Sequence, residues 1–244
     1  MLFLLRKIRR KMLIKNKFTT YVLYAIGEII LVVVGILIAV QIDDWNKQKQ
    51  NHKTEMRYIS DLINDLTQDS IYLASIKKIS DAQVKSKDRL EEFWEGKKIN
   101  EDSLYQIFQS QWANRYSFKP SATTLSEMKS TGTLGVISNE LLRKKILETY
   151  FKYDQYLEND EALYKKLQEK CMDAIYERIP NLFGKFTFGD MRPDLNVYLQ
   201  LAEIKNRLLG NHVWGLNLAL VEIIEVNSSC LSSVKEEYRK LSTR

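Results

Sequence analysis

A predominantly apolar run of 22 residues, from Tyr21 to Ile42, constrains this chain more than any other feature. At about 1.5 Å per residue, a helix of that length extends about 33 Å, enough for a bilayer core of about 30 Å. A buried helix of a soluble protein is rarely so long and so rich in Ile, Leu and Val. A cleaved signal peptide has a shorter apolar region and a small-x-small cleavage site, which "ILIAVQIDDW" lacks. The run therefore predicts an uncleaved transmembrane signal anchor.

The charged residues on either side of this run predict its direction across the membrane. Residues 1–20 contain seven Lys or Arg and no acidic residue, whereas acidic residues dilute the basic ones that follow the run. Because basic flanks stay in the cytoplasm, we expect residues 1–20 to be a cytoplasmic segment that contacts anionic lipid headgroups. Residues 21–42 then span the membrane, and residues 43–244 form an extracytoplasmic domain.

The net charge does not favour nucleic-acid binding. The whole chain carries +6, which is less than the seven positive charges of residues 1–20, so the remainder carries −1. A nucleic-acid-binding domain needs a basic face, and the main domain has too little positive charge to form one. We therefore expect no nucleic-acid partner.

The domain after the run is predicted to be all-α. No Gly or Pro falls between Gly35 and Gly96, so the helix of the span can continue outward as one rod, with a break near residues 43–51 as the alternative. Beyond it, apolar residues recur at helical spacing, with Asp65 and Asp69 among the polar residues between them.

Three further signals place helices later in the chain. Thr124 and Glu127 form a T-x-x-E capping box that predicts a short helix. Ser138 is expected to cap a long helix that reaches about Ile179, where a proline ends it, and a last helix runs over about 213–241. Together with the rod, these segments predict an antiparallel helical bundle.

Two stretches of sequence resemble a known family. "KFTTYVLYAIGEIILVVVGILIAVQIDDWN" (17–46) is similar to the N-terminus of a large family of uncharacterised single-pass bacterial membrane proteins, classified as a domain of unknown function. "TTLSEMKSTGTLGVISNELLRKKILETYFKYD" (123–154) resembles an internal block of the same family. The resemblance implies the same topology in a bacterial inner membrane, an all-helical periplasmic domain and no enzymatic activity.

The sequence contains no residue set that supports catalysis, a cofactor or a metal. Its two histidines, His52 and His212, have no helical partner at metal-ligand spacing, and no phosphate loop, nucleophile elbow or dinucleotide fingerprint occurs. Ser126 and Lys129 match the S-x-x-K pattern of penicillin-recognising enzymes, but residues 75–78 match it equally well, so the pattern carries little information. We expect no enzymatic activity, no cofactor and no metal.

A polar segment with two glycines, residues 123–135, is the candidate surface for a ligand or partner. Such a segment between helices presents hydroxyls, a carboxylate and free backbone groups. The alternative is that its residues only cap helices and turn the chain. The candidate residues are Thr124, Glu127, Ser130, Gly132 and Arg143.

The two cysteines, Cys171 and Cys230, also leave two alternatives open. Both lie in the predicted extracytoplasmic domain, where an oxidising compartment permits a disulfide between them. Each also lies on the apolar face of its helix, where a free cysteine is an ordinary core residue.

One face of the predicted span carries a carboxylate and two small residues. Steps of 4, 3 and 4 residues place Glu28, Val32, Gly35 and Ala39 on the same side of a helix, and the Gly35/Ala39 pair permits close approach of a second helix. Three arrangements accommodate Glu28: protonation, extension toward the basic flank, or hydrogen bonding within an oligomer. We expect this face to be a helix–helix interface.

These features favour a non-enzymatic scaffold or interaction protein of the cell envelope, which associates with itself, with another membrane protein, or with both. A ligand-sensing or transport-accessory subunit with a pocket near Thr124–Gly132 is the alternative.

Overall fold

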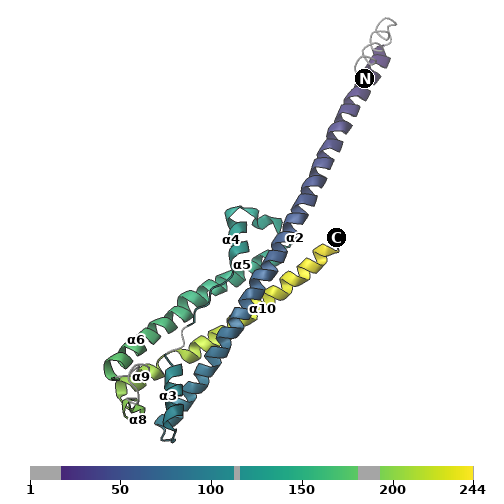
Figure 1. Cartoon of the computed structure of the whole chain (residues 1–244). Helices are drawn as coiled ribbons and strands as arrows, with labels where there is room; N and C mark the ends of the chain where they lie inside the picture. The colour runs from purple at the N-terminus through teal and green to yellow at the C-terminus, as the bar shows by residue number, and fades with distance from the viewer. Residues whose placement is uncertain (1–17, 113–115, 181–192, 244) are drawn as a thin grey trace. The chain divides into compact units, whose positions relative to one another are not determined.

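The computed structural model of the protein describes residues 18–112, 116–180 and 193–243 (Figure 1). Helices make up 85% of the structure and no β-strand occurs in these ranges, which confirms the all-α prediction. The chain divides into two compact units, residues 1–54 and residues 55–244. Nearly all of the predicted basic segment, residues 1–20, lies outside the described residues.

The described part of unit 1 belongs to helix α2 (Phe18–Trp94). This helix is long and apolar enough to cross a membrane, and none of its most apolar 18-residue window is buried. The alternative break near residues 43–51 does not occur, because α2 is helical throughout that stretch. The absence of Gly and Pro after Gly35 accounts for this continuity.

Unit 2 contains the rest of α2 and a series of shorter and longer helices. In its described residues these are α3 (Glu101–Ser110), α4 (Thr123–Ser130), the 3₁₀ turn η1 (Thr133–Val136), α5 (Glu140–Gln155), the π-helix η2 (Tyr156–Glu161), α6 (Ala162–Arg178), α8 (Leu195–Tyr198), α9 (Ala202–Leu209) and α10 (Val213–Ser242).

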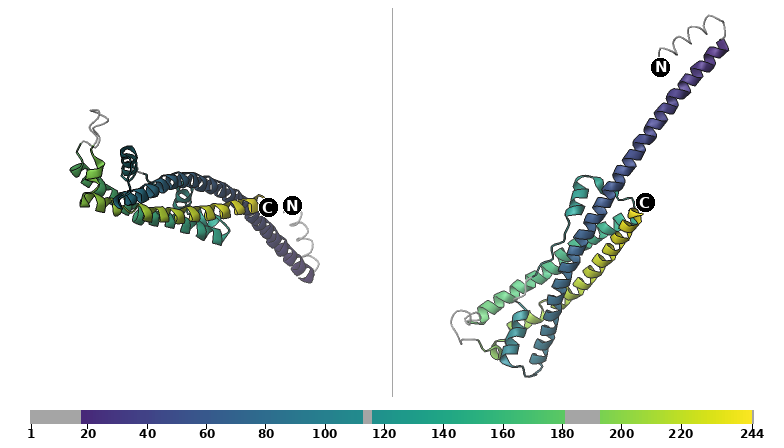
Figure 2. Two further views of the ribbon diagram at one scale, coloured as in Figure 1. Left: turned by 90° about the horizontal axis from the view of Figure 1, so that it is seen from below. Right: turned by 45° about the vertical axis from the view of Figure 1, so that its right-hand side comes forward.

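Helix α10 runs antiparallel to its neighbours in unit 2. Figure 2 shows it beside the unit 2 part of α2 in both views, and the Asn227 amide donates to the Leu66 carbonyl at 3.1 Å. The start of α5 lies beside the end of α10, since the side-chain amide of Asn139 donates to Glu237 at 2.7 Å. The predicted antiparallel bundle of unit 2 therefore has α2, α5–α6 and α10 as its long elements.

Two hydrophobic clusters form the core of unit 2. The larger one joins α2, α5 and α10, and its fully buried members include Ile59, Tyr153 and Leu220. The smaller one joins the end of α2 to α3, α6, α8 and α9, which gather at one end of the unit (Figure 1). Burial on this scale lets unit 2 form a core from its own residues.

The predicted long helix from Ser138 to Ile179 differs from the structure in two respects. Asn139 is its N-cap, because the Asn139 side chain accepts from the Leu142 N–H, whereas Ser138 donates to Glu55 from both its N–H (2.7 Å) and its hydroxyl (2.8 Å). The helix is also interrupted by η2, where the backbone widens to a π-helix. Sequence periodicity missed this interruption because α5 and α6 continue in the same direction on either side.

Candidate functional site

Two carboxylates of α2 hold the segment that leads into α4. Asp69 accepts a hydrogen bond from the Ser121 N–H at 2.7 Å, and Asp65 accepts one from the Thr124 N–H at 3.1 Å. Both carboxylates are buried, although the sequence pattern placed them between the core positions of α2. They are buried because α4 and its connector cover this face of α2. Each satisfies a backbone donor that would otherwise lack a partner near the helix start.

The predicted capping box of α4 is wrong. The helix follows Ala122 with no side-chain cap from its own residues, and the Asp65 carboxylate of α2 takes the N–H of Thr124 instead. Glu127, the other half of the expected box, accepts a hydrogen bond from the Arg57 guanidinium at 3.0 Å. That bond lowers the pKa of Glu127.

The other residues of the predicted ligand or partner surface also make internal contacts. The Ser130 hydroxyl donates to the carbonyl of Glu127 at 2.9 Å, and the Arg143 guanidinium donates to the carbonyl of Ile137 at 3.0 Å. Gly132 has φ of +69°, a left-handed conformation that favours glycine. Segment 123–135 thus caps helices and turns the chain, and a ligand or partner there stays a prediction.

A second polar network lies where α9 leads into α10. The buried Lys87 amine donates to the Leu209 carbonyl at 2.6 Å and to the Asn211 side-chain oxygen at 3.1 Å. It also lies 4.5 Å from the centre of the Trp214 ring. Burial lowers the pKa of Lys87. Because the Leu209 carbonyl belongs to the C-terminal end of α9, this lysine serves as a cap from another helix.

The two cysteines are free and buried. Cys171 belongs to the smaller hydrophobic cluster and Cys230 to the larger one, so each packs as a core residue of its own helix. Burial raises the pKa of Cys171 to about 12 and that of Cys230 in the same direction. The disulfide alternative is not formed in the structure, and thiols of this kind are poor nucleophiles.

The predicted assembly face of unit 1 is exposed. Glu28, Val32, Gly35 and Ala39 all lie within α2, and none of them is covered by another part of the chain. A methyl group added at Gly35 would meet no atom within 4 Å. This face of α2 is thus available to lipid or to another helix.

The π-helix η2 places two side chains in the interior that an α-helix would separate. Tyr156 and Glu161 are both buried, although they are five residues apart. At about 100° per residue, an α-helix would turn them about 140° away from each other. The wider turn brings both inward, and Glu161 then accepts from the Ser117 hydroxyl at 2.6 Å and from the Phe118 N–H at 2.8 Å.

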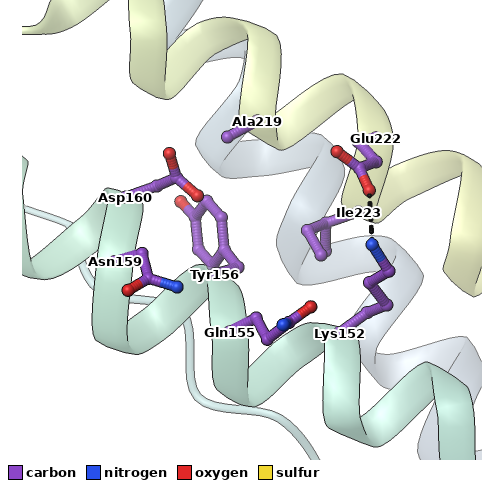
Figure 3. Close-up of a pocket in the computed structure, with 8 residues that line it drawn as sticks. All are labelled: Lys152, Gln155, Tyr156, Asn159, Asp160, Ala219, Glu222 and Ile223. Carbon is purple, nitrogen blue, oxygen red and sulfur yellow. Dashed lines mark hydrogen bonds and ion pairs between the residues drawn. The ribbon is translucent and has the colours of Figure 1, made fainter.

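A polar pocket of about 170 Å³ lies between η2 and α10 (Figure 3). One wall comes from the end of α5 and from η2, and the other comes from α10. Lys152 and Glu222 form an ion pair of 3.1 Å across it. The lining residues are Lys152, Gln155, Tyr156, Asn159, Asp160, Ala219, Glu222 and Ile223. This pocket is the strongest candidate site in unit 2, because π-helices within α-helices are frequent at functional sites.

A larger groove of about 560 Å³ adjoins this pocket at Lys152. It also lies between α5 and α10, and the exposed Phe151 ring contributes to its lining together with Val226 and Thr149. Sequence reasoning missed both hollows. Their walls are contributed by helices about 70 residues apart, and only the packing of α5 against α10 brings them together.

The described residues contain no group of three or more His, Cys, Asp or Glu side chains placed to hold a metal ion.

Comparison with known proteins identifies a family. The model of DUF6090, a family of unknown function, matches residues 28–185. The chain belongs to DUF6090. No curated protein and no solved structure matches this chain. The match to DUF6090 includes the predicted assembly face and η2.

Proposed function

We propose that this DUF6090 protein is a single-pass, membrane-anchored interaction protein of the bacterial cell envelope, without enzymatic activity. The observation that supports the anchor is the contrast between the two units. Unit 2 gathers its buried apolar side chains in two clusters, whereas the Ile, Leu and Val side chains of α2 between residues 22 and 42 form an uninterrupted exposed stretch. An apolar surface of that length is costly in water and is satisfied by lipid.

The proposed orientation follows from the flanking charges. The basic residues of segment 1–20 keep the N-terminus in the cytoplasm, against the anionic headgroups of the inner leaflet. Unit 2 then lies in the periplasm. The exposed Trp45 is placed at the outer interface, where aromatic side chains are enriched.

The proposed partner is a second copy of the chain, another membrane protein, or both, bound through the face formed by Glu28, Val32, Gly35 and Ala39. Gly35 and Ala39 lack bulk, so the backbone of a neighbouring helix can approach closely there. Within such an interface the Glu28 carboxyl group gains hydrogen-bond partners that lipid cannot supply.

Membrane extraction combined with protease accessibility tests the anchor and its direction. The full-length protein should stay in the membrane pellet after alkaline washing. A C-terminal epitope tag should be digested in spheroplasts, where the outer face is accessible, and an N-terminal tag should be digested only after lysis. Release by alkaline washing would contradict the anchor, and the reverse protease pattern would contradict the orientation.

A further inference from the structure

We propose that the pocket between η2 and α10 binds a small primary amine in its ammonium form. This site goes beyond the proposed anchoring and interaction function and does not depend on it. The proposal moves the ligand-sensing alternative away from segment 123–135, whose candidate side chains make internal contacts, to a pocket that contains polar groups without partners.

The Tyr156 hydroxyl is the first of these groups. The Tyr156 side chain is only 2% exposed, and its oxygen has no hydrogen-bond partner in the described structure. Figure 3 shows the ring directed into the pocket, with the hydroxyl toward Asp160. A buried hydroxyl without a partner destabilises a fold, and a phenylalanine would avoid that cost. The hydroxyl is accounted for if it contacts a ligand.

The charges that line the pocket select a cation. Lys152, which is the only basic residue among the lining side chains, already forms an ion pair with Glu222. Asp160 makes no ion pair or hydrogen bond with any described side chain, so the lining carries one uncompensated negative charge. An anion would be repelled by Asp160, whereas an ammonium group would be attracted to it.

The acceptors that line the pocket suit an ammonium group better than a metal ion. An ammonium carries three N–H donors, and the pocket is lined by the Asp160 carboxylate, the Tyr156 hydroxyl and the side-chain amides of Gln155 and Asn159, all of which contain an acceptor oxygen. Divalent metals in proteins prefer several carboxylate or imidazole ligands, and no such group occurs among the described residues. The Tyr156 ring also presents an aromatic surface to a cation.

The size and the apolar lining of the pocket suit a short molecule. A volume of 170 Å³ holds about six water molecules at liquid density. Ala219 and Ile223 of α10 line the side opposite the polar residues of η2, where they can contact a short alkyl chain. A primary amine with about three carbons satisfies both conditions.

Calorimetric titration of the full-length protein in detergent micelles with n-propylamine at pH 7 tests the proposal. Saturable binding is expected for n-propylamine, and none is expected for 1-propanol or propionate, which match it in size. Calcium and magnesium chloride serve as further comparators. Saturable binding of either metal ion in place of the amine would overturn the proposal, as would the absence of saturable n-propylamine binding.

Two variants distinguish a loss of ligand binding from a loss of folding. Tyr156→Phe and Asp160→Asn should each weaken n-propylamine binding at least tenfold, whereas Asp154→Asn, an exposed carboxylate on α5 outside the pocket, should bind as the unmodified protein does. Tyr156→Phe should melt at the same temperature as the unmodified protein or higher, which shows that its lost binding is not a folding defect. Unchanged binding by both variants would overturn the proposal and leave the membrane anchor unaffected.

Discussion

Asp69 shows how a single buried residue contributes to the response of unit 2 to pH. Its side chain is 1% exposed, and burial raises its pKa above the ordinary value of 3.8 despite the hydrogen bond from Ser121. A carboxyl group whose pKa is higher in the folded state favours folding while it is protonated. Stability is therefore lost as the pH rises from about 4 through the raised pKa of Asp69.

We predict that Asp69→Asn removes this pH-dependent loss. The asparagine oxygen still accepts the Ser121 N–H, and the variant has no charge to bury. The variant should therefore gain unfolding free energy relative to the unmodified protein as the pH rises from 4 to 7. Urea unfolding of the full-length protein at both pH values measures it. If the variant and the unmodified protein differed in unfolding free energy by the same amount at pH 4 and at pH 7, the raised pKa of Asp69 would be contradicted.

The buried Lys87 supplies a charged donor to the Leu209 carbonyl and to the Asn211 side-chain oxygen. We predict that Lys87→Met lowers the unfolding free energy by about 1–3 kcal/mol, because the Leu209 carbonyl and the Asn211 oxygen both lose a charged donor. Lys85→Met, an exposed lysine two residues earlier on the same helix, is the control and should change stability by less than about 0.5 kcal/mol. Equal effects in thermal unfolding would show that Lys87 is not a structural cap.

At the scale of elements, α4 depends on a carboxylate from α2 for its start. We predict that Asp65→Ala lowers the unfolding free energy by about 1–2 kcal/mol and increases hydrogen exchange at the Thr124 amide. Thr124→Val keeps the backbone N–H and removes the hydroxyl of the expected capping box. It should therefore leave stability nearly unchanged. A larger loss of stability from Thr124→Val than from Asp65→Ala would favour the Thr124 hydroxyl over the Asp65 carboxylate as the cap of α4.

Sequence periodicity predicted the helices and failed where a distant helix contributes. The spacing of apolar residues and the lack of Gly and Pro predicted α2, and α10 begins at the expected Val213. The capping box at Thr124 has the correct residues and the correct spacing, but Asp65 lies close enough to take its place. Nothing local to Asp65 signals this, because it depends on how α4 packs against α2.

The pocket was equally inaccessible to sequence reasoning. Helical spacing places Tyr153, Leu157 and Tyr164 on one inward stripe, yet the structure buries Tyr156 more completely than Leu157. Tyr156 follows the buried Tyr153 at a regular helical step of three residues, and the π-turn of η2 then brings Glu161 inward. A single π-turn leaves the helical pattern before and after it intact, so the sequence carries no clear mark of it.

At the scale of the whole molecule, self-association is predicted to depend on the small residues of the span. Gly35→Ile should reduce the dimeric or higher fraction in membranes at least several-fold, because the added side chain separates the neighbouring helices. Gly27→Ile is the matched control: it lies about 80° around the helix from Gly35, and its added atoms likewise meet nothing within 4 Å. Quantitative energy transfer between labelled copies in membranes measures both variants, and equal losses would argue against a specific face.

Cysteine cross-linking in native membranes tests the central claim most directly, that the chain is anchored by its apolar span and assembles through one face of it. Single cysteines replace residues at positions 28, 35 and 39 on the proposed face, or at positions 30, 33 and 37 away from it. The buried Cys171 and Cys230 should not react. We predict that cross-linked dimers form substantially more at 28, 35 and 39. Equal cross-linking at all six positions, or none at any of them, would contradict the claim.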